Sequence, residues 1–138
     1  IFLGYGPMAL AQTTPPPAPK IVVEAFLTLG SDCQFTKGIK EILDPYVKAN
    51  PDKIKVVYAG RDNPEVQAIM QERFGFTCLT VTVQGQYRFT LQNADGTARK
   101  VAFNRPPADL NPQGQGTWKT DDMKRVINYY LKAMYPAK

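Results

Sequence analysis

The stretch KIVVEAFLTLGSDCQFTKG, residues 20–38, takes the chain from a run of strand-forming residues into a long helix. Its first seven residues are mostly apolar and rich in valine and isoleucine, which predicts a buried strand over 20–26. From Cys33 onward, apolar residues recur at helical spacing as far as Asn50, which predicts an amphipathic helix. A cysteine at such a junction is a typical position for thiol chemistry. Cys33 is therefore a working thiol, a remnant of one, or a small buried residue.

The rest of the chain alternates between strand and helix patterns. Further strands are predicted over 54–60, 78–83, 87–91 and 98–103, helices over 64–75 and from a Thr120 cap onward, and a Pro/Gly/Asn-rich loop over 104–118. Arg61 and Asp62 are assigned to a loop that ends in the helix cap Asn63-Pro64. The order is β-α-β-α-β-β-β-α, which predicts one α/β domain over residues 20–138. Its first two strands are expected to be parallel, and its later strands to extend the same mixed central sheet, flanked by helices.

This order, with a cysteine at the start of the first helix, resembles the thioredoxin-like fold over residues 20–136. One extra strand (98–103) and the long loop are inserted before the last helix. Active members of that family open the first helix with a C-x-x-C motif, in which the first thiol attacks and the second resolves the mixed disulfide. Here Cys33-Gln34-Phe35-Thr36 is C-x-x-T, which keeps an attacking thiol and lacks the resolving one. If the alignment is shifted so that Cys33 is the second position, Gly30 is the first, and the pair is still incomplete.

The family also carries a cis-proline before its third strand, and this chain has none there. FTCLTVTV (76–83) places Leu79 or its neighbours at that position, where we expect a trans peptide and a reshaped groove. Cys78 lies nearby, and the resemblance implies that it could be a neighbour of Cys33. Three interpretations are open: a structural Cys33–Cys78 disulfide, two free thiols, or a redox site that turns over.

The composition excludes several kinds of chemistry. The 138 residues contain no histidine and two cysteines, so histidine-based catalysis and zinc or iron–sulfur sites lack their usual ligands. We predict no metal and no cofactor. The length is sufficient for one domain with a hydrophobic core of its own.

The net charge of +5 lies in the C-terminal part of the chain. Residues 1–85 carry eight basic and eight acidic side chains, whereas residues 86–138 carry nine basic and four acidic ones. This excess indicates either an electropositive face for an acidic partner or membrane surface, or a plain solvated surface. No nucleic-acid motif accompanies it, so nucleic acid is not expected as a partner.

Five residues in and around the 104–118 loop are candidates for contacting a partner: Arg99, Lys100, Arg105, Trp118 and Lys119. Trp118 could anchor a partner in a pocket or tuck the loop onto the domain. The loop itself could be a contact surface or a passive connector. A polar pocket near Arg99, Arg105 and Lys119 would instead indicate a binding site for a small anionic ligand.

The N-terminal segment predicts export. Residues 1–11 are uncharged, and Ala9-Leu10-Ala11 before Gln12 resembles the A-x-A cleavage site of a signal peptide. We interpret residues 1–19 as the remnant of a signal or anchor segment followed by a proline-rich linker, TTPPPAPK. The predicted location is periplasmic or extracytoplasmic, with possible membrane contact through residues 1–11.

The sequence thus predicts an exported, membrane-associated thioredoxin-like domain that acts as a non-catalytic accessory subunit of a larger envelope assembly and binds protein partners. The alternative is a thiol-disulfide oxidoreductase in which Cys33 attacks and Cys78, or an external thiol, resolves.

Overall fold

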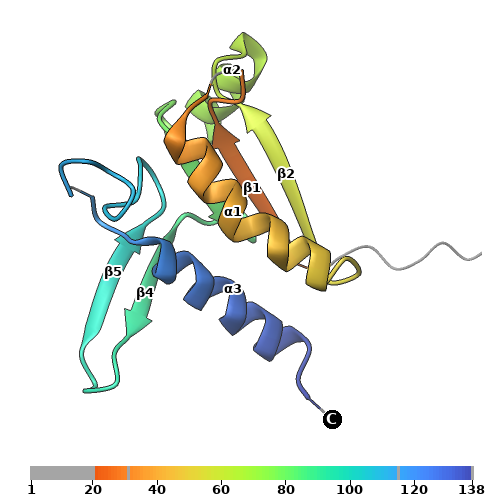
Figure 1. The fold of residues 1–138 in the computed structure, drawn as a ribbon, viewed down its shortest axis with the longest axis vertical. Coiled ribbons are helices and arrows are strands. Elements are labelled where there is room, and N and C mark those ends of the chain that lie inside the picture. Colours follow the sequence, from red (N-terminus) through yellow and green to blue (C-terminus); the bar gives the residue numbers. More distant parts are fainter. Residues whose placement is uncertain (1–20, 31, 115, 138) are drawn as a thin grey trace, which may run out of the picture.

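The computed structural model describes residues 21–30, 32–114 and 116–137 of the chain (Figure 1). Its elements are β1 (Ile21–Leu27), α1 (Gln34–Ala49), β2 (Ile54–Gly60), α2 (Pro64–Phe74), β3 (Thr80–Val83), β4 (Arg88–Gln92), β5 (Ala98–Ala102) and α3 (Thr120–Met134). The mixed α/β class and the order of the elements are therefore confirmed. The predicted signal or anchor segment and its linker, residues 1–19, lie outside the described residues.

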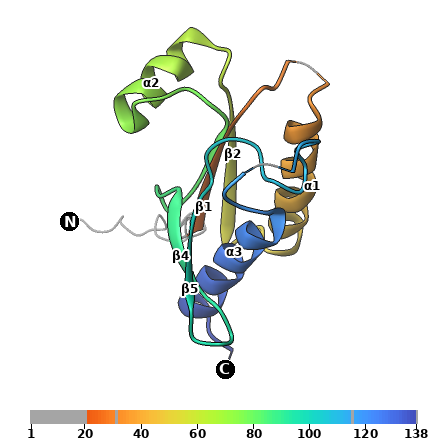
Figure 2. The ribbon, with the colours of Figure 1, turned by 90° about the vertical axis from the view of Figure 1, so that its left-hand side faces the viewer.

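The larger sheet has three strands in the order β2-β1-β3. β1 is parallel to β2, with Ile21 opposite Ile54, and antiparallel to β3, with Val23 opposite Val83. The predicted parallel pair is confirmed. Helices α1 and α3 lie on one side of this sheet and α2 lies on the other, which Figure 2 shows in side view. The sheet is thus a central layer between helices.

The last two strands differ from the prediction. Among the described residues, β4 and β5 pair only with each other and form a separate two-stranded sheet, so the expectation of one central sheet is wrong. The reason is that the residues after β5 occupy the free edge of β3. Val81 donates its backbone N–H to the Phe103 carbonyl at 2.8 Å, and Arg105 donates to the Leu79 carbonyl at 2.6 Å. This leaves no room for β4 to pair with β3 beyond the turn that joins them.

The core lies between the three-stranded sheet and the helices α1 and α3. β1 is buried along most of its length, since it has a strand on each side and helices over both faces. α1 contributes Ile39 and Leu43, and α3 contributes Met123 and Ile127, all four with no exposed surface. At the surface, Tyr46 of α1 donates its hydroxyl to Asn128 of α3 at 2.9 Å. The two helices are therefore held side by side over one core.

The ends of α2 follow the prediction, and the start of α3 does not. Asn63 caps α2 by accepting the Glu65 N–H at 2.8 Å, and Gly75 ends it at a φ of 80°. In α3 the N-cap is Lys119, and Thr120 is already the first helical residue. Thr120 instead donates its N–H and hydroxyl to Asp109, at 3.0 and 2.6 Å. The helix start is therefore tied to the preceding loop.

Candidate functional site

Four segments meet at one edge of the three-stranded sheet. β1 and β2 are parallel, so both strands end at this edge, with Thr28 and Arg61 as the next residues. β3 is antiparallel to β1, so it begins at the same edge, just after Thr77 and Cys78. α1 also begins here, with Cys33 at its N-cap. Residues that are far apart in the sequence thus form a cluster at the carboxyl ends of the parallel strands.

Arg61 is the side chain that joins these segments. Its Nη1 donates to the Thr28 hydroxyl at 3.1 Å, and its Nε donates to the Thr77 carbonyl at 3.1 Å. Its backbone N–H also donates to the Leu27 carbonyl at 2.8 Å. Within the part of the chain that the structure describes, Arg61 makes no ion pair with a carboxylate. Its positive charge therefore acts on the other groups of the cluster.

Cys33 lies where this positive charge and the helix N-terminus converge. Its backbone is extended, with φ −85° and ψ 124°, and its side chain is half-buried. Burial by itself raises the pKa of the Cys33 thiol, but the nearby backbone N–H groups of Thr36 and Phe35 at the helix N-terminus, together with the charge of Arg61, outweigh it. The pKa of Cys33 is therefore below that of an ordinary cysteine, which favours the nucleophilic thiolate.

Thr36 takes the position of the second cysteine in the C-x-x-T stretch. Its side chain is 6% exposed, and its hydroxyl donates to the Thr28 carbonyl at 2.8 Å. The same hydroxyl faces Cys33 and contributes to lowering the pKa of that thiol. A hydroxyl has one proton, so Thr36 gives it either to Thr28 or to the thiolate. Thr36 thus supports the thiol and has no sulfur with which to resolve a mixed disulfide.

Cys78 lies on the segment that leads into β3, and it is also half-buried. The structure describes Cys33 and Cys78 as two free cysteines. A disulfide between them stays a prediction that thiol titration can test. All peptide bonds of the described residues are trans, including the one before Leu79. The Thr77 and Leu79 carbonyls on this segment each accept an internal hydrogen bond, from the Arg61 side chain and from the Arg105 N–H.

Two of the five residues predicted to contact a partner have internal partners. Arg99 of β5 forms a bidentate ion pair with the carboxylate of Asp122, which is 3% exposed in α3. Trp118 is 1% exposed, packs against Phe103 with a ring-centre distance of 4.8 Å, and donates its indole N–H to the Arg105 carbonyl at 3.1 Å. Trp118 therefore tucks the loop onto the domain and is not a surface anchor, because a buried indole with a satisfied N–H offers nothing to a partner.

The other three candidates, Lys100, Arg105 and Lys119, are exposed. Arg105 has a φ of 73°, and its backbone links the loop to both Leu79 and Trp118. A cavity of about 440 Å³ next to Arg105 is lined by Ala102, Asn104, Gly116 and Thr117. That cavity includes neither Arg99 nor Lys119. The polar pocket expected for a small anionic ligand is therefore not assembled from these three residues.

The sequence analysis identified Thr36 as the residue at the second position of C-x-x-T, but it missed Arg61 and Thr28 as residues of the site. Arg61 was assigned to a loop that ends in a helix cap, although it directly follows a strand of the parallel pair. That position was the available signal, since residues after parallel strands gather at one sheet edge. Which of those residues meet was not readable from the sequence.

Glu24 of β1 has a structural role away from Cys33. Its carboxylate accepts two hydrogen bonds from Arg73 of α2, at 2.9 and 2.8 Å, and one from the Thr82 hydroxyl at 2.8 Å. The Arg73 guanidinium, together with Thr82, holds the pKa of Glu24 below its usual value despite desolvation. Glu24 thus fastens α2 to the sheet.

None of the helices in residues 21–137, the omitted positions aside, combines the length and apolarity that crossing a bilayer requires. In the same residues, no three cysteine or carboxylate side chains gather as metal ligands would. Comparison of the chain with models of known families, with curated proteins and with solved structures found no match.

Proposed function

We propose that this chain is an exported, thioredoxin-like domain whose Cys33 is a single reactive thiol that forms mixed disulfides with protein partners. The fold assignment rests on the β2-β1-β3 order, with one parallel and one antiparallel neighbour of β1, and on a cysteine at the N-cap of the helix after β1. The observation that carries the function is the position of Cys33 at the N-cap of α1, at the sheet edge where Arg61 joins Thr28 and Thr77. The helix N-terminus and the Arg61 charge lower the pKa of Cys33 there.

The chemistry is thiol–disulfide exchange, which needs no cofactor. The Cys33 thiolate attacks one sulfur of a partner's disulfide, a new S–S bond forms, and the other partner cysteine leaves as a thiolate. An external thiolate that attacks the partner's sulfur then takes over the partner and releases the Cys33 thiolate. If Cys78 instead attacks the Cys33 sulfur, a Cys33–Cys78 bond forms and the partner leaves as a thiolate. Because Thr36 replaces the resolving cysteine, the mixed disulfide persists until that second thiol arrives.

The test is to incubate the reduced protein with glutathione disulfide and to measure intact mass over time. We expect one glutathione per chain, located at Cys33 by peptide mapping, with the same rate in Cys78→Ser and no such adduct in Cys33→Ser. A rate at Cys33 no faster than that of Cys78 would overturn the proposal. Release of glutathione with formation of a Cys33–Cys78 bond would identify Cys78 as the resolving thiol.

The second candidate is the non-catalytic accessory module in an envelope or membrane assembly. It is favoured by Thr36 in place of a second thiol and by the occupied carbonyls of Thr77 and Leu79. Both candidates place the domain outside the cytoplasm, on the basis of the signal-like segment before residue 20. Capture of partners from an envelope extract separates them: a reductant releases a mixed-disulfide partner but leaves a non-covalent one bound.

A further inference from the structure

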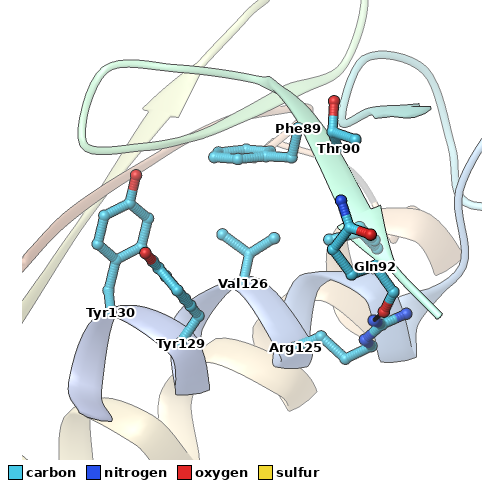
Figure 3. Close-up of a pocket in the computed structure, with 8 residues that line it drawn as sticks. Phe89, Thr90, Gln92, Arg125, Val126, Tyr129 and Tyr130 are labelled. Atoms are coloured by element: carbon cyan, nitrogen blue, oxygen red, sulfur yellow. Dashed lines mark hydrogen bonds between the residues drawn. The ribbon is translucent and has the colours of Figure 1, made fainter. Parts of the chain in front are cut away.

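A cavity of about 510 Å³ lies between β4 and α3, and Cys33 is not among its lining residues. Figure 3 shows Phe89 and Val126 facing each other across it, with Tyr129 and Tyr130 toward one end and Arg125 and Gln92 toward the other. Its remaining lining residues are Thr90 and Leu91. Four consecutive residues of β4 therefore form one wall, and α3 forms the facing wall.

The wall formed by β4 is an unpaired strand edge. Among the described residues, the neighbouring strand of β4 is β5 and no other. The Tyr87 carbonyl accepts the Phe103 N–H at 2.7 Å, and the Asn93 N–H donates to Thr97 at 2.8 Å, so the odd-numbered residues direct their backbone groups toward β5. In an antiparallel pair the alternate residues direct theirs away. The backbone groups of Arg88, Thr90 and Gln92 thus lie on the free edge.

A contact with α3 confirms the direction of this edge. Arg125 of α3 donates its Nη2 to the Gln92 carbonyl at 2.5 Å, so the free edge of β4 faces the helix across the cavity. An edge that presents backbone donors and acceptors beside an apolar groove is suited to accept an additional strand. The groove would receive alternate side chains of that strand, as in other cases of β-strand addition.

The side chains that line the groove determine which side chains a bound strand would need. Val126 and Leu91 are 4% and 8% exposed and form an apolar floor, whereas Tyr129 is 67% exposed and has no covering element. None of the lining residues is acidic, and Arg125 supplies a positive charge with no carboxylate partner among the described residues. Arg88, at the other end of β4, is likewise without an ion pair and lies over the Tyr87 ring at 5.1 Å.

We infer that the groove between β4 and α3 binds an extended segment of a partner protein in which apolar residues alternate with acidic ones. The segment adds to the β4 edge by backbone hydrogen bonds, places its apolar side chains between Phe89 and Val126, and pairs its carboxylates with Arg125 and Arg88. The surface is independent of Cys33 and of the function proposed for it.

The test uses the full chain and a fluorescein-labelled peptide of about ten residues, long enough to cover a strand, with alternating glutamate and valine. A peptide of alternating lysine and valine is the charge control. Fluorescence anisotropy should show saturable binding of the glutamate peptide and none of the lysine peptide. Arg125→Gln should weaken binding about tenfold, which is the loss of one charge-assisted hydrogen bond.

Lys124→Gln is the matched control, because it removes the neighbouring charge of α3 but does not line the cavity. It should change the affinity by less than about twofold, as expected for an exposed charge outside the contact. Tyr129→Ser, at an exposed position, should weaken binding without unfolding the protein. Cys33→Ser should bind as tightly as the parent chain, which separates this inference from the thiol proposal.

Three results would overturn the inference. The first is equal binding of both peptides, or of neither. The second is an equal effect of Arg125→Gln and Lys124→Gln. The third is a concentration-dependent dimer that Tyr129→Ser dissociates in sedimentation, since a second copy of the chain would then be the occupant of the groove.

Discussion

Arg61 acts on the Cys33 thiol by its charge, which makes the pKa of Cys33 the most direct property to measure. A nearby cation stabilises the thiolate, so its removal raises the pKa. We expect Arg61→Gln to shift the pH profile of Cys33 alkylation to higher pH and to slow the reaction at pH 7. Arg88→Gln, which removes the same charge from β4, is the control and should leave the profile unchanged. Identical profiles for parent and Arg61→Gln would show that the helix N-terminus acts alone.

The same shift predicts how stability depends on pH. The pKa of Cys33 is lower in the folded protein than in the unfolded chain. The unfolded chain therefore binds more protons at pH values between the folded pKa and the ordinary cysteine pKa of about 8.5. The contribution of Cys33 to the unfolding free energy is therefore present above that unfolded value and is lost as the pH falls through the folded one. Urea denaturation under reducing conditions should show this rise in the parent chain, and a smaller rise in Cys33→Ser.

Thr36 is the residue that keeps the site a single thiol. Thr36→Cys restores the C-x-x-C spacing, and we expect the glutathione adduct of Cys33 to be released as an intrachain disulfide forms. The variant loses the hydrogen bond to the Thr28 carbonyl, which should cost about 1 kcal/mol of stability in the reduced state. Thr36→Ser keeps the hydroxyl and is the control. Thr36→Ser should retain the glutathione adduct as the parent chain does. Intact mass distinguishes a retained adduct from a released one.

Arg105 holds a strained backbone conformation. A φ of 73° is unfavourable for a residue with a Cβ atom, by about 1–2 kcal/mol, and glycine adopts it freely. Part of that gain is offset by the greater freedom of glycine in the unfolded chain. We therefore expect Arg105→Gly to raise the unfolding free energy by about 0.5–1 kcal/mol. Arg105→Ala keeps the strain, and a stabilisation of the same size in that variant would contradict this account.

At the scale of the elements, Asp122 connects the start of α3 to the β4-β5 sheet. Its carboxylate accepts the Lys119 N–H at 2.8 Å and pairs with Arg99 of β5. Asp122→Asn should lower the unfolding free energy by about 1–3 kcal/mol, because it weakens a nearly buried ion pair and a helix cap together. Arg99 is 44% exposed, so solvent screens the pair and the lower part of this range is expected.

Asp121 provides the matched control for that change. It is the preceding residue of the same helix turn, and its side chain is 86% exposed. Asp121→Asn should change stability by no more than about 0.5 kcal/mol in urea denaturation. Equal losses in the two variants would mean that the helix dipole, and not the contact with β5, accounts for the effect.

The elements themselves were largely predictable, and so were the ends of α2, but the start of α3 was not. Helical periodicity located α1 and α3 because each has one apolar face. Which residues of α2 are buried is not evident from its sequence: Ile69 is 48% exposed although it is apolar, whereas the adjacent Met70 has no exposed surface. The cap of α3 was placed at Thr120 because threonine is a common N-cap. Asp109, eleven residues away, takes the Thr120 hydroxyl instead.

At the scale of the whole molecule, the 104–118 loop is closed onto the core by Trp118. Trp118 is the one tryptophan of the chain and is buried, so the tryptophan fluorescence of the protein reports on that closure alone. We expect blue-shifted emission that iodide does not quench in the folded protein, and a single red shift on unfolding that coincides with the loss of helix by circular dichroism. Red-shifted, quenchable emission before unfolding would show that the loop opens independently of the domain.

The sequence by itself determined the α/β class, the order of the elements and the parallel pairing of β1 and β2, because local propensity and hydrophobic periodicity encode these features. It also determined that Cys33 lies at a helix start without a second cysteine in the helix. The tertiary structure alone decided that Arg61 joins the segments around Cys33, that Trp118 is buried, and that Phe103 to Arg105 displace β4 from the edge of β3. These three outcomes depend on which segments compete for the same space and the same hydrogen-bonding groups, and a linear pattern contains no record of that competition.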